Sequence, residues 1–268
     1  MTELLERIDA AWAALTPAER VVAEHLRRHP DEVVLYNSTE LARRSGVSKA
    51  TVSRLLRSLG WTDAVDARTQ LRTQRARGVP VGPGEPVDAG DGVQAALASL
   101  AAAGESRLAE AVANAGRVLV VGFRNSYPVA LHLREQLAQA RGGVRLAPVA
   151  GQSLAEEVID LDATDLVVVI GFRRRPGSFE ALMEHLRSAP AQVVVITDPS
   201  GGRYLAGHDF GISCPIDSEG PFDSYAAAMA LVARIASGVH RRLGEPARRR
   251  ALAIADLYAR LGEVEGPA

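Results

Sequence analysis

Residues 38–61, STELARRSGVSKATVSRLLRSLGW, decide how the N-terminal part of this chain folds. Apolar residues recur at helical spacing on both sides of Gly46, which predicts two short helices joined by a tight turn. Ser38 is placed to cap the first helix and Ser48 the second, because a hydroxyl at the N-cap accepts a hydrogen bond from a free backbone N–H. Gly60 ends the second helix. We therefore expect a helix–turn–helix motif.

The outer side of the second helix is predicted to carry small residues, hydroxyls and cations. This is the chemistry of a helix that reads the DNA major groove, because short side chains let the backbone approach the phosphates. Between Arg43 and Arg57 there are five cations and no carboxylate. The residues predicted to contact DNA are Ser38, Ser48, Lys49, Thr51, Ser53, Arg54 and Arg57. A helix–turn–helix also occurs as a plain structural corner, and a basic helix face is usually only solvated, so both readings stay open.

Helices are also predicted on both sides of this motif. Thr16-Pro17-Ala18-Glu19 has the pattern of a capping box with proline at the first helical position, and His29-Pro30 ends the helix that it opens. An all-helical domain is therefore expected over residues 1–77. Its further helices are predicted at residues 2–14, 31–36 and 63–77.

Five short motifs keep a specific order along this domain. They are LTPAER at residues 15–20, His29-Pro30, ELA at residues 40–42, GVSKATVSR at residues 46–54 and LGW at residues 59–61. Their order and spacing resemble the DNA-binding domain of RpiR-type transcriptional regulators over nearly all of residues 1–75. Leu55 stands where relatives often carry an aromatic residue, and we expect it in the core.

Composition restricts the class of protein. The chain has 268 residues, 47% of them apolar and 24% charged, which fits one or two globular domains. No run of about 18 apolar residues is present, so no membrane span is expected. The N-terminus carries acids and no apolar signal core, and the single cysteine, Cys214, excludes an intramolecular disulfide and a thiolate zinc cluster. These features predict a cytoplasmic location.

Charge is unevenly distributed along the chain. Residues 1–77 hold 13 Lys and Arg against 10 Asp and Glu, whereas the remainder holds 18 against 22. The basic part is therefore the part with the predicted reading helix. Lys49 is the only lysine, so no lysine outside that helix can form a Schiff base or complete a phosphate-binding P-loop.

Residues 78–92, GVPVGPGEPVDAGDG, hold five glycines and three prolines and are predicted to be a linker. From residue 93 onward, apolar runs at residues 117–122, 165–171 and 192–197 alternate with helical patterns, and weaker strands are predicted at 144–149 and 209–214. Continuous apolar runs are typical of parallel strands covered on both faces. Residues 93–268 are therefore expected to form a doubly wound α/β domain with a parallel sheet.

Three polar turns follow the predicted strands: GFRNS at residues 122–126, GFRRRPGS at residues 171–178 and TDPSGG at residues 197–202. Ligands of such sheets bind at the carboxyl ends of the strands, where the strand order reverses. The first turn, Asp165 and the run VITD at residues 195–198 resemble the sugar isomerase (SIS) domain. This resemblance implies binding of a phosphorylated sugar or similar carbohydrate derivative, with Ser126 as a phosphate or hydroxyl contact.

The second turn departs from the family pattern. Three arginines stand where the family commonly has a serine- and threonine-rich phosphate loop, and paired guanidiniums can clamp a phosphate or carboxylate. Alternatively, these arginines point to solvent, pair with Glu156, Glu157 or Glu180, or bridge subunits. The residues predicted to bind the ligand are Arg124, Asn125, Ser126, Arg173, Arg174, Arg175, Ser178 and Glu219.

The sequence thus predicts a transcriptional regulator that binds double-stranded operator DNA as a homodimer or homotetramer and senses a small anionic carbohydrate-type effector. We expect no enzymatic activity, no cofactor and no metal, since no metal-ligand spacing or dinucleotide-binding pattern is present. The rival prediction is a phosphosugar isomerase with an accessory helical domain, which requires a general base in the cleft.

Overall fold

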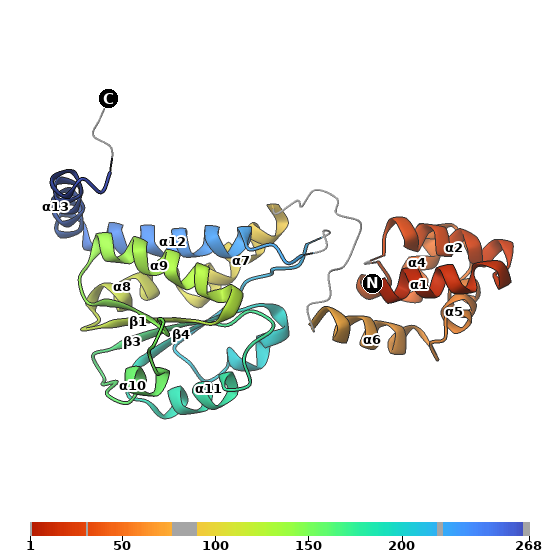
Figure 1. Cartoon of the computed structure of the whole chain (residues 1–268), viewed down its shortest axis with the longest axis horizontal. Helices are drawn as coiled ribbons and strands as arrows, with labels where there is room; N and C mark the ends of the chain where they lie inside the picture. The colour runs from red at the N-terminus through yellow and green to blue at the C-terminus, as the bar shows by residue number, and fades with distance from the viewer. Residues whose placement is uncertain (1, 31, 77–89, 219–221, 265–268) are drawn as a thin grey trace. The chain divides into compact units, whose positions relative to one another are not determined.

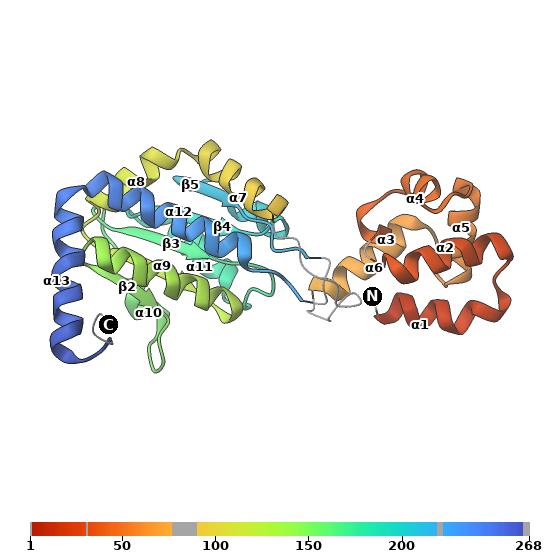
Figure 2. The same ribbon diagram turned by 90° about the horizontal axis from the view of Figure 1, so that it is seen from above.

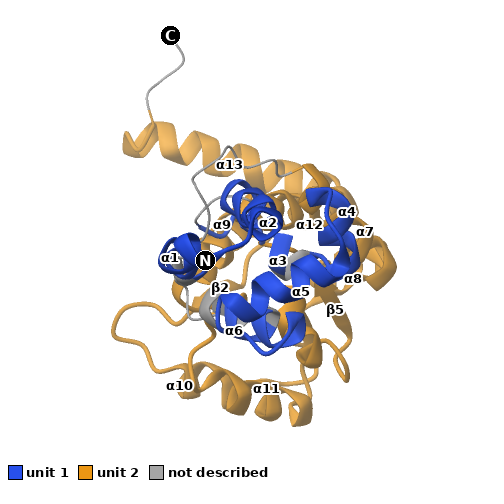
Figure 3. Ribbon diagram, turned by 90° about the vertical axis from the view of Figure 1, so that its right-hand side faces the viewer, with its two compact units in different colours: residues 1–88, 217–224 blue, residues 89–216, 225–268 orange. Residues whose placement is uncertain are grey.

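The computed structural model describes residues 2–30, 32–76, 90–218 and 222–264. It contains two compact units, residues 1–88 with 217–224 and residues 89–216 with 225–268 (Figure 3). Residues 90–92, which the sequence places in the linker, are helical and open α7 (Gly90–Ala103). Asp91 favours a helix start there because a carboxylate in the first turn complements the helix dipole. The rest of the predicted linker lies outside the described residues. Among the described helices, none combines the length and apolar character needed to cross a membrane.

The first unit is helical, as predicted. The helix expected at residues 2–14 is divided into an α-helix and a 3₁₀ turn, and the other boundaries shift by one to three residues. The elements are α1 (Thr2–Ala11), η1 (Trp12–Ala14), α2 (Pro17–Arg28), α3 (Glu32–Leu35), α4 (Ser38–Ser45), α5 (Lys49–Ser58) and α6 (Ala64–Ala76).

The predicted capping box of α2 is confirmed. The Thr16 hydroxyl accepts a hydrogen bond from the Glu19 N–H at 3.3 Å, and the Glu19 carboxylate accepts one from the Thr16 N–H at 2.9 Å. The unit is held together by one apolar cluster, whose largest fully buried members include Trp61, Leu26 and Leu55. Leu55 lies in this core, as expected.

The second unit is an α/β domain with a five-stranded parallel sheet in the order β2-β1-β3-β4-β5. Its strands are β1 (Val118–Gly122), β2 (Val144–Ala147), β3 (Leu166–Ile170), β4 (Gln192–Thr197) and β5 (Phe210–Ser213). Its helices are α7, α8 (Glu105–Asn114), η2 (Arg124–Ser126), α9 (Tyr127–Ala140), α10 (Leu154–Val158), α11 (Phe179–Ser188), η3 (Pro199–Tyr204), α12 (Ala226–Leu243) and α13 (Glu245–Leu261). The prediction of a parallel, doubly wound sheet is confirmed.

Helices cover both faces of this sheet (Figures 1 and 2). Residues such as Val118 and Val120 of β1 face the cluster formed with α7, α8, α9 and α12, whereas Leu119 and Val121 face the cluster formed with α10 and α11. This alternation follows from the two-residue period of a strand, and it explains why the strands are apolar throughout. Strand β1 has β2 on one side and β3 on the other, so the strand order reverses beside it.

Helix α12 packs against the sheet of its own unit. Ala228, Leu231 and Val232 are fully buried in the same cluster as the strands and α9. Cys214 belongs to this cluster too, and burial raises the pKa of its thiol to about 12. It is therefore a small core residue.

Candidate functional sites

The helix–turn–helix is formed by α4 and α5. Gly46 ends α4 in the left-handed conformation, with φ at 71°, so that the chain turns without a steric penalty. The prediction that Ser38 caps α4 is wrong, because Asn37 has the extended backbone of an N-cap and Ser38 is the first helical residue. The Asn37 side chain accepts hydrogen bonds from the backbone N–H groups of Thr39 and Glu40 at 2.9 and 3.1 Å.

Ser48 caps α5, as predicted. Its hydroxyl accepts a hydrogen bond from the Thr51 N–H at 3.1 Å, and the two side-chain hydroxyls lie 2.9 Å apart. The prediction that Thr51 lies on the outer side of the helix is wrong, since only 5% of this residue is exposed. Thr51 precedes Leu55 by four residues, so both belong to the face that packs into the core.

The outer face of α5 carries four of the predicted DNA contacts, whereas Ser38 begins α4 and is half-buried. Lys49, Arg54 and Arg57 are exposed, and Ser53 is half-buried. The Nε atoms of Arg54 and Arg57 donate to carbonyls one turn earlier in α5, at 3.4 and 3.2 Å. Within the described part of the chain, no carboxylate forms an ion pair with these three cations. Their charge is therefore available to a polyanion.

Arg44 has a different environment. Its guanidinium binds the buried carboxylate of Glu32 at 2.7 Å and lies 4.4 Å from the centre of the Tyr36 ring. His25 contacts the second oxygen of Glu32 at 2.6 Å. Burial alone would raise the pKa of Glu32, but the hydrogen bonds from Arg44 and His25 together lower it below its usual value. Arg44 therefore stabilises the unit.

Glu19 links the capping box of α2 to the end of the outward-facing helix α5. Its carboxylate accepts hydrogen bonds from the Thr16 hydroxyl at 2.6 Å and from the Ser58 hydroxyl at 3.3 Å. These bonds, that of Thr16 foremost, lower the pKa of Glu19, and the nearby charge of Arg54 acts in the same direction. Sequence patterns miss this link because Glu19 and Ser58 are separated by 39 residues.

The carboxyl edge of the parallel sheet contains the predicted ligand residues. The turns after β1 and β3 are neighbours, because these strands pair directly. Ser126 is buried, and its hydroxyl accepts a hydrogen bond from the Phe172 N–H at 3.0 Å. Ser126 therefore joins the two turns. Arg124, with φ at 52°, and Asn125 are exposed beside it.

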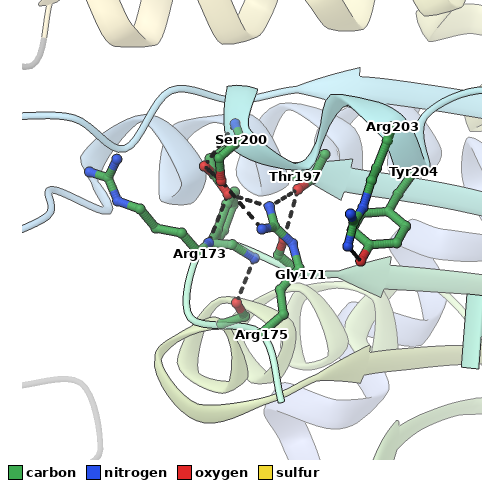
Figure 4. A network of polar contacts seen from close by, with 10 residues as sticks. Gly171, Arg173, Arg175, Thr197, Ser200, Arg203 and Tyr204 are labelled. Carbon is green, nitrogen blue, oxygen red and sulfur yellow. Dashed lines mark hydrogen bonds and ion pairs between the residues drawn. The ribbon is translucent and has the colours of Figure 1, made fainter. Parts of the chain in front are cut away.

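Arg175 points into the protein (Figure 4). Its Nη2 donates to Thr197 Oγ1 and to Asp198 Oδ1, each at 2.5 Å, and its Nη1 lies 3.3 Å from Ser200 Oγ. The guanidinium also lies 5.9 and 5.6 Å from the ring centres of Phe179 and Tyr204. Only 13% of the Arg175 side chain is exposed. The side chain thus adopts an internal position that the sequence did not indicate.

Asp198 is the centre of this network. The carboxylate is 1% exposed and also accepts hydrogen bonds from the Arg173 N–H at 2.7 Å, the Ser200 N–H at 3.1 Å and the Ser200 hydroxyl at 2.5 Å. Thr197 donates its own hydroxyl to the carbonyl of Gly171 at 2.7 Å. The ends of β3 and β4 are therefore joined through side chains.

The predicted ligand residues separate into two groups. Ser126 and Arg175 are turned inward, whereas the other side chains lie toward solvent. Arg124, Asn125, Arg174 and Ser178 are exposed, and Arg173 is half-buried and extends away from the network (Figure 4). Glu219 lies outside the described residues. Of the proposed acidic partners, Glu180 pairs with Arg203 at 3.2 Å rather than with the turn.

No group of three or more His, Cys, Asp or Glu side chains that could hold a metal ion is found among the residues that the structure describes.

Comparison with known proteins places both units in known domain families. Residues 2–77 match the helix-turn-helix domain of the rpiR family, and residues 111–237 match the SIS domain. The chain therefore combines a helix-turn-helix domain of the rpiR family with a SIS domain.

Curated relatives match this chain over 78 residues, a length close to that of the helix-turn-helix domain. The bifunctional protein Glk of Paraburkholderia xenovorans is 38% identical over 78 residues, which are 29% of this chain and 12% of Glk. The HTH-type transcriptional regulator HexR of Pseudomonas aeruginosa is 35% identical over 78 residues, which are 29% of this chain and 27% of HexR. The match thus spans well under two thirds of either relative's length.

Solved structures are similar to this chain in fold. The sugar isomerase domain of an RpiR transcription factor from Sphaerobacter thermophilus has a TM-score of 0.54 at 21% identity, covering 63% of this chain and 94% of that one. The NanR protein of Vibrio vulnificus, complexed with ManNAc-6P, has a TM-score of 0.52 at 20% identity, covering 96% of this chain and 98% of that one.

Proposed function

We propose that this chain is an RpiR-type transcriptional regulator whose α5 helix binds operator DNA and whose α/β unit senses a small anionic carbohydrate derivative. One observation carries the DNA-binding half. Helix α5 presents Lys49, Arg54 and Arg57 to solvent, while Ser48 caps its N-terminus and buried leucines fix its other face. A rigid helix with unpaired cations on its outer face fits the major groove, where cations contact phosphates and base edges.

Duplex binding at several salt concentrations tests this half. We expect affinity to fall steeply with salt, because each phosphate contact releases condensed counterions. Arg54→Ala should weaken binding and reduce the slope of log K against log salt by about 1 if Arg54 contacts a phosphate. Arg28→Ala is a matched control, because Arg28 is an exposed arginine of the same unit that pairs with Glu24 on α2. Equal losses for both variants would argue against a specific role for α5.

The ligand half of the proposal rests on the carboxyl edge of the sheet. Arg124 and Arg174 present exposed guanidiniums at neighbouring turns, and the turn after β1 leads through η2 into α9. Arginines bind phosphate or carboxylate groups through paired N–H donors. The fold similarity to NanR, which has been solved with ManNAc-6P, supports a phosphosugar as the first class of ligand to test.

Calorimetry with the full chain tests this half. The probes are inorganic phosphate, a hexose 6-phosphate, an N-acetylhexosamine 6-phosphate and a hexonic acid. Arg124→Ala and Arg174→Ala should each weaken binding of the preferred probe. Arg187→Ala is a control, because this exposed arginine is in the last turn of α11. Variants at Arg124 and Arg174 that bind as tightly as the wild type would contradict this assignment.

A DNA reader of this type binds paired half-sites, so the active form is expected to be at least a dimer. Helix α13 offers a surface for a second copy, because Leu252, Leu257 and Leu261 are 62%, 44% and 62% exposed. Light scattering should show a smaller assembly for Leu257→Glu than for the wild type. An unchanged mass would place the interface elsewhere.

The rival function is a phosphosugar isomerase. The fold alone does not separate it from a sensor, since one fold can carry unrelated functions. Incubation with the preferred sugar phosphate separates the two, because a sensor returns the ligand unchanged whereas an isomerase converts it.

A further inference from the structure

We infer that Asp198 competes with the effector for Arg175, so that a bound anion replaces Asp198 as the partner of this guanidinium and frees the turn at residues 172–178. This inference rests on the ligand half of the proposed function. It adds a residue, Asp198, that the predicted site did not include. It also gives the buried arginine a role in the response.

The first observation is that Arg175 is incompletely paired. Its contact with Asp198 uses Nη2 alone, and Nη2 is shared with Thr197. The Nε atom is buried and has no hydrogen-bond partner among the described residues. An arginine binds an oxyanion most strongly through two parallel N–H donors, and a buried donor without an acceptor destabilises the state that contains it. The present arrangement therefore leaves part of the binding capacity of Arg175 unused.

The second observation is that Asp198 does not depend on Arg175 alone. Its Oδ2 accepts two hydrogen bonds from Ser200, and its Oδ1 accepts one from the Arg173 N–H. After Arg175 leaves, the Ser200 bonds can persist because η3 holds both residues in one turn. Losing the guanidinium thus leaves the buried carboxylate of Asp198 with its hydrogen bonds from Ser200, which reduce the free-energy cost of breaking the ion pair.

The third observation is that the turn is held in a strained shape. Arg174, next to Arg175, has φ at 49°, a left-handed conformation that is unfavourable for a residue with a Cβ atom. The close approach of the Arg175 guanidinium to the backbone of η3 also requires Gly201, since a Cβ atom there would lie 2.2 Å from Arg175 Nη2. A turn that relaxes when Arg175 changes partner is the kind of two-state element through which a ligand acts.

The chemistry of the exchange defines the ligand. It must carry two acceptor oxygens on one centre, as phosphate and carboxylate do, to engage the Nε and Nη donors side by side. A neutral sugar without such a group cannot replace Asp198. Exposed Arg124 and Arg174 lie on the same edge of the sheet and add charge that attracts an anion to it.

Calorimetry with inorganic phosphate and a hexose 6-phosphate, on the full chain, tests the inference. Asp198→Asn removes the competing charge and should tighten binding about tenfold, the size of one charge-assisted hydrogen bond. Thr197→Val removes one acceptor of Arg175 without changing charge and should tighten binding by a smaller factor. Arg175→Gln should weaken binding at least tenfold. Asp160→Asn removes an exposed carboxylate at the opposite edge of the sheet and should change nothing.

The outcomes separate the inference from the proposed function. If the wild type binds a probe and folded Asp198→Asn binds it equally or more weakly, the competition is refuted while the sensor proposal stands. If Asp198→Asn does not fold, Thr197→Val decides in the same way, because unchanged or weaker binding refutes the competition. If neither the wild type nor Asp198→Asn binds any probe, both the inference and the ligand half of the proposed function fall.

Discussion

The paired hydroxyls of Ser48 and Thr51 offer a direct test of how α5 is built. Ser48 is exposed and caps the helix, whereas the Thr51 side chain is buried and bonded to it at 2.9 Å. We predict that Ser48→Ala destabilises the helical unit, that Thr51→Val is nearly neutral, and that the double variant is less destabilised than Ser48→Ala.

The magnitudes follow from the two contacts. Ser48→Ala loses an N-cap, which costs about 1 kcal/mol, and leaves the buried Thr51 hydroxyl without its partner, which adds about 1 kcal/mol or more. Thr51→Val removes the buried hydroxyl and leaves Ser48 free to bond water, so its effect should stay within about 0.5 kcal/mol. The double variant should lose the cap alone, about 1 kcal/mol. For a unit of this size, about 1 kcal/mol shifts the Tm by roughly 4–8 °C.

Tryptophan fluorescence measures this unit selectively, because the chain's two tryptophans, Trp12 and Trp61, both lie in the helical unit. Urea unfolding of the four proteins gives the cycle, and duplex binding is measured in parallel. Thr51→Val should keep its DNA affinity within about threefold, since a buried hydroxyl cannot reach a base or phosphate.

Two results would refute this reasoning. If Thr51→Val lost more stability than Ser48→Ala, the Ser48 hydroxyl would not be the helix cap that satisfies the buried Thr51 hydroxyl. A stable Thr51→Val variant that loses DNA affinity as strongly as Lys49→Ala would mean that Thr51 faces DNA after all.

Further predictions concern pH, packing and thiol reactivity. Hydrogen bonds lower the pKa of Glu19 in the folded state, so its contribution to stability is present above its ordinary pKa and is lost as pH falls through the folded pKa. The urea midpoint followed by tryptophan fluorescence should therefore be lower for Glu19→Gln than for the wild type at neutral pH, and the difference should shrink as the pH falls. Gly201→Ala should destabilise the α/β unit by about 1–3 kcal/mol in thermal melts, because its Cβ would lie 2.0 Å from Thr197 Oγ1, whereas Gly202→Ala meets nothing within 4 Å and should be tolerated. Cys214, buried and with a pKa of about 12, should resist a thiol reagent at pH 8 until denaturant unfolds the domain, and fast labelling of the native chain would contradict its burial.

Much of the fold could be predicted because local patterns and packing agree. The capping box at Thr16 and Glu19 and the turn at Gly46 are short-range features, and the structure contains both. The apolar runs predicted as covered parallel strands form the middle of the sheet, β1, β3 and β4. The sequence pattern predicts Ser38 as the N-cap of α4, whereas the structure has Asn37 in that position. Both residue types favour N-caps, and only the backbone geometry distinguishes them.

The candidate sites were less predictable, since side-chain direction depends on distant partners. Thr51 is small and polar, so its residue type alone does not show that it lies on the face of α5 that packs into the core. Arginine is usually exposed, and the inward turn of Arg175 depends on Asp198, 23 residues away, and on the absence of a Cβ atom at Gly201. No local pattern contains that information.

Three hydrogen bonds link the ends of the neighbouring strands β1, β3 and β4. The Phe172 N–H donates to the Ser126 hydroxyl, the Thr197 hydroxyl to the Gly171 carbonyl, and the Arg173 N–H to the Asp198 carboxylate. A substitution in any one of these turns should therefore alter the neighbouring turns, so the carboxyl edge of the sheet is expected to respond as one coupled unit. Mutational effects around it should be strongly non-additive, so that the role of each side chain emerges only from pairwise combinations.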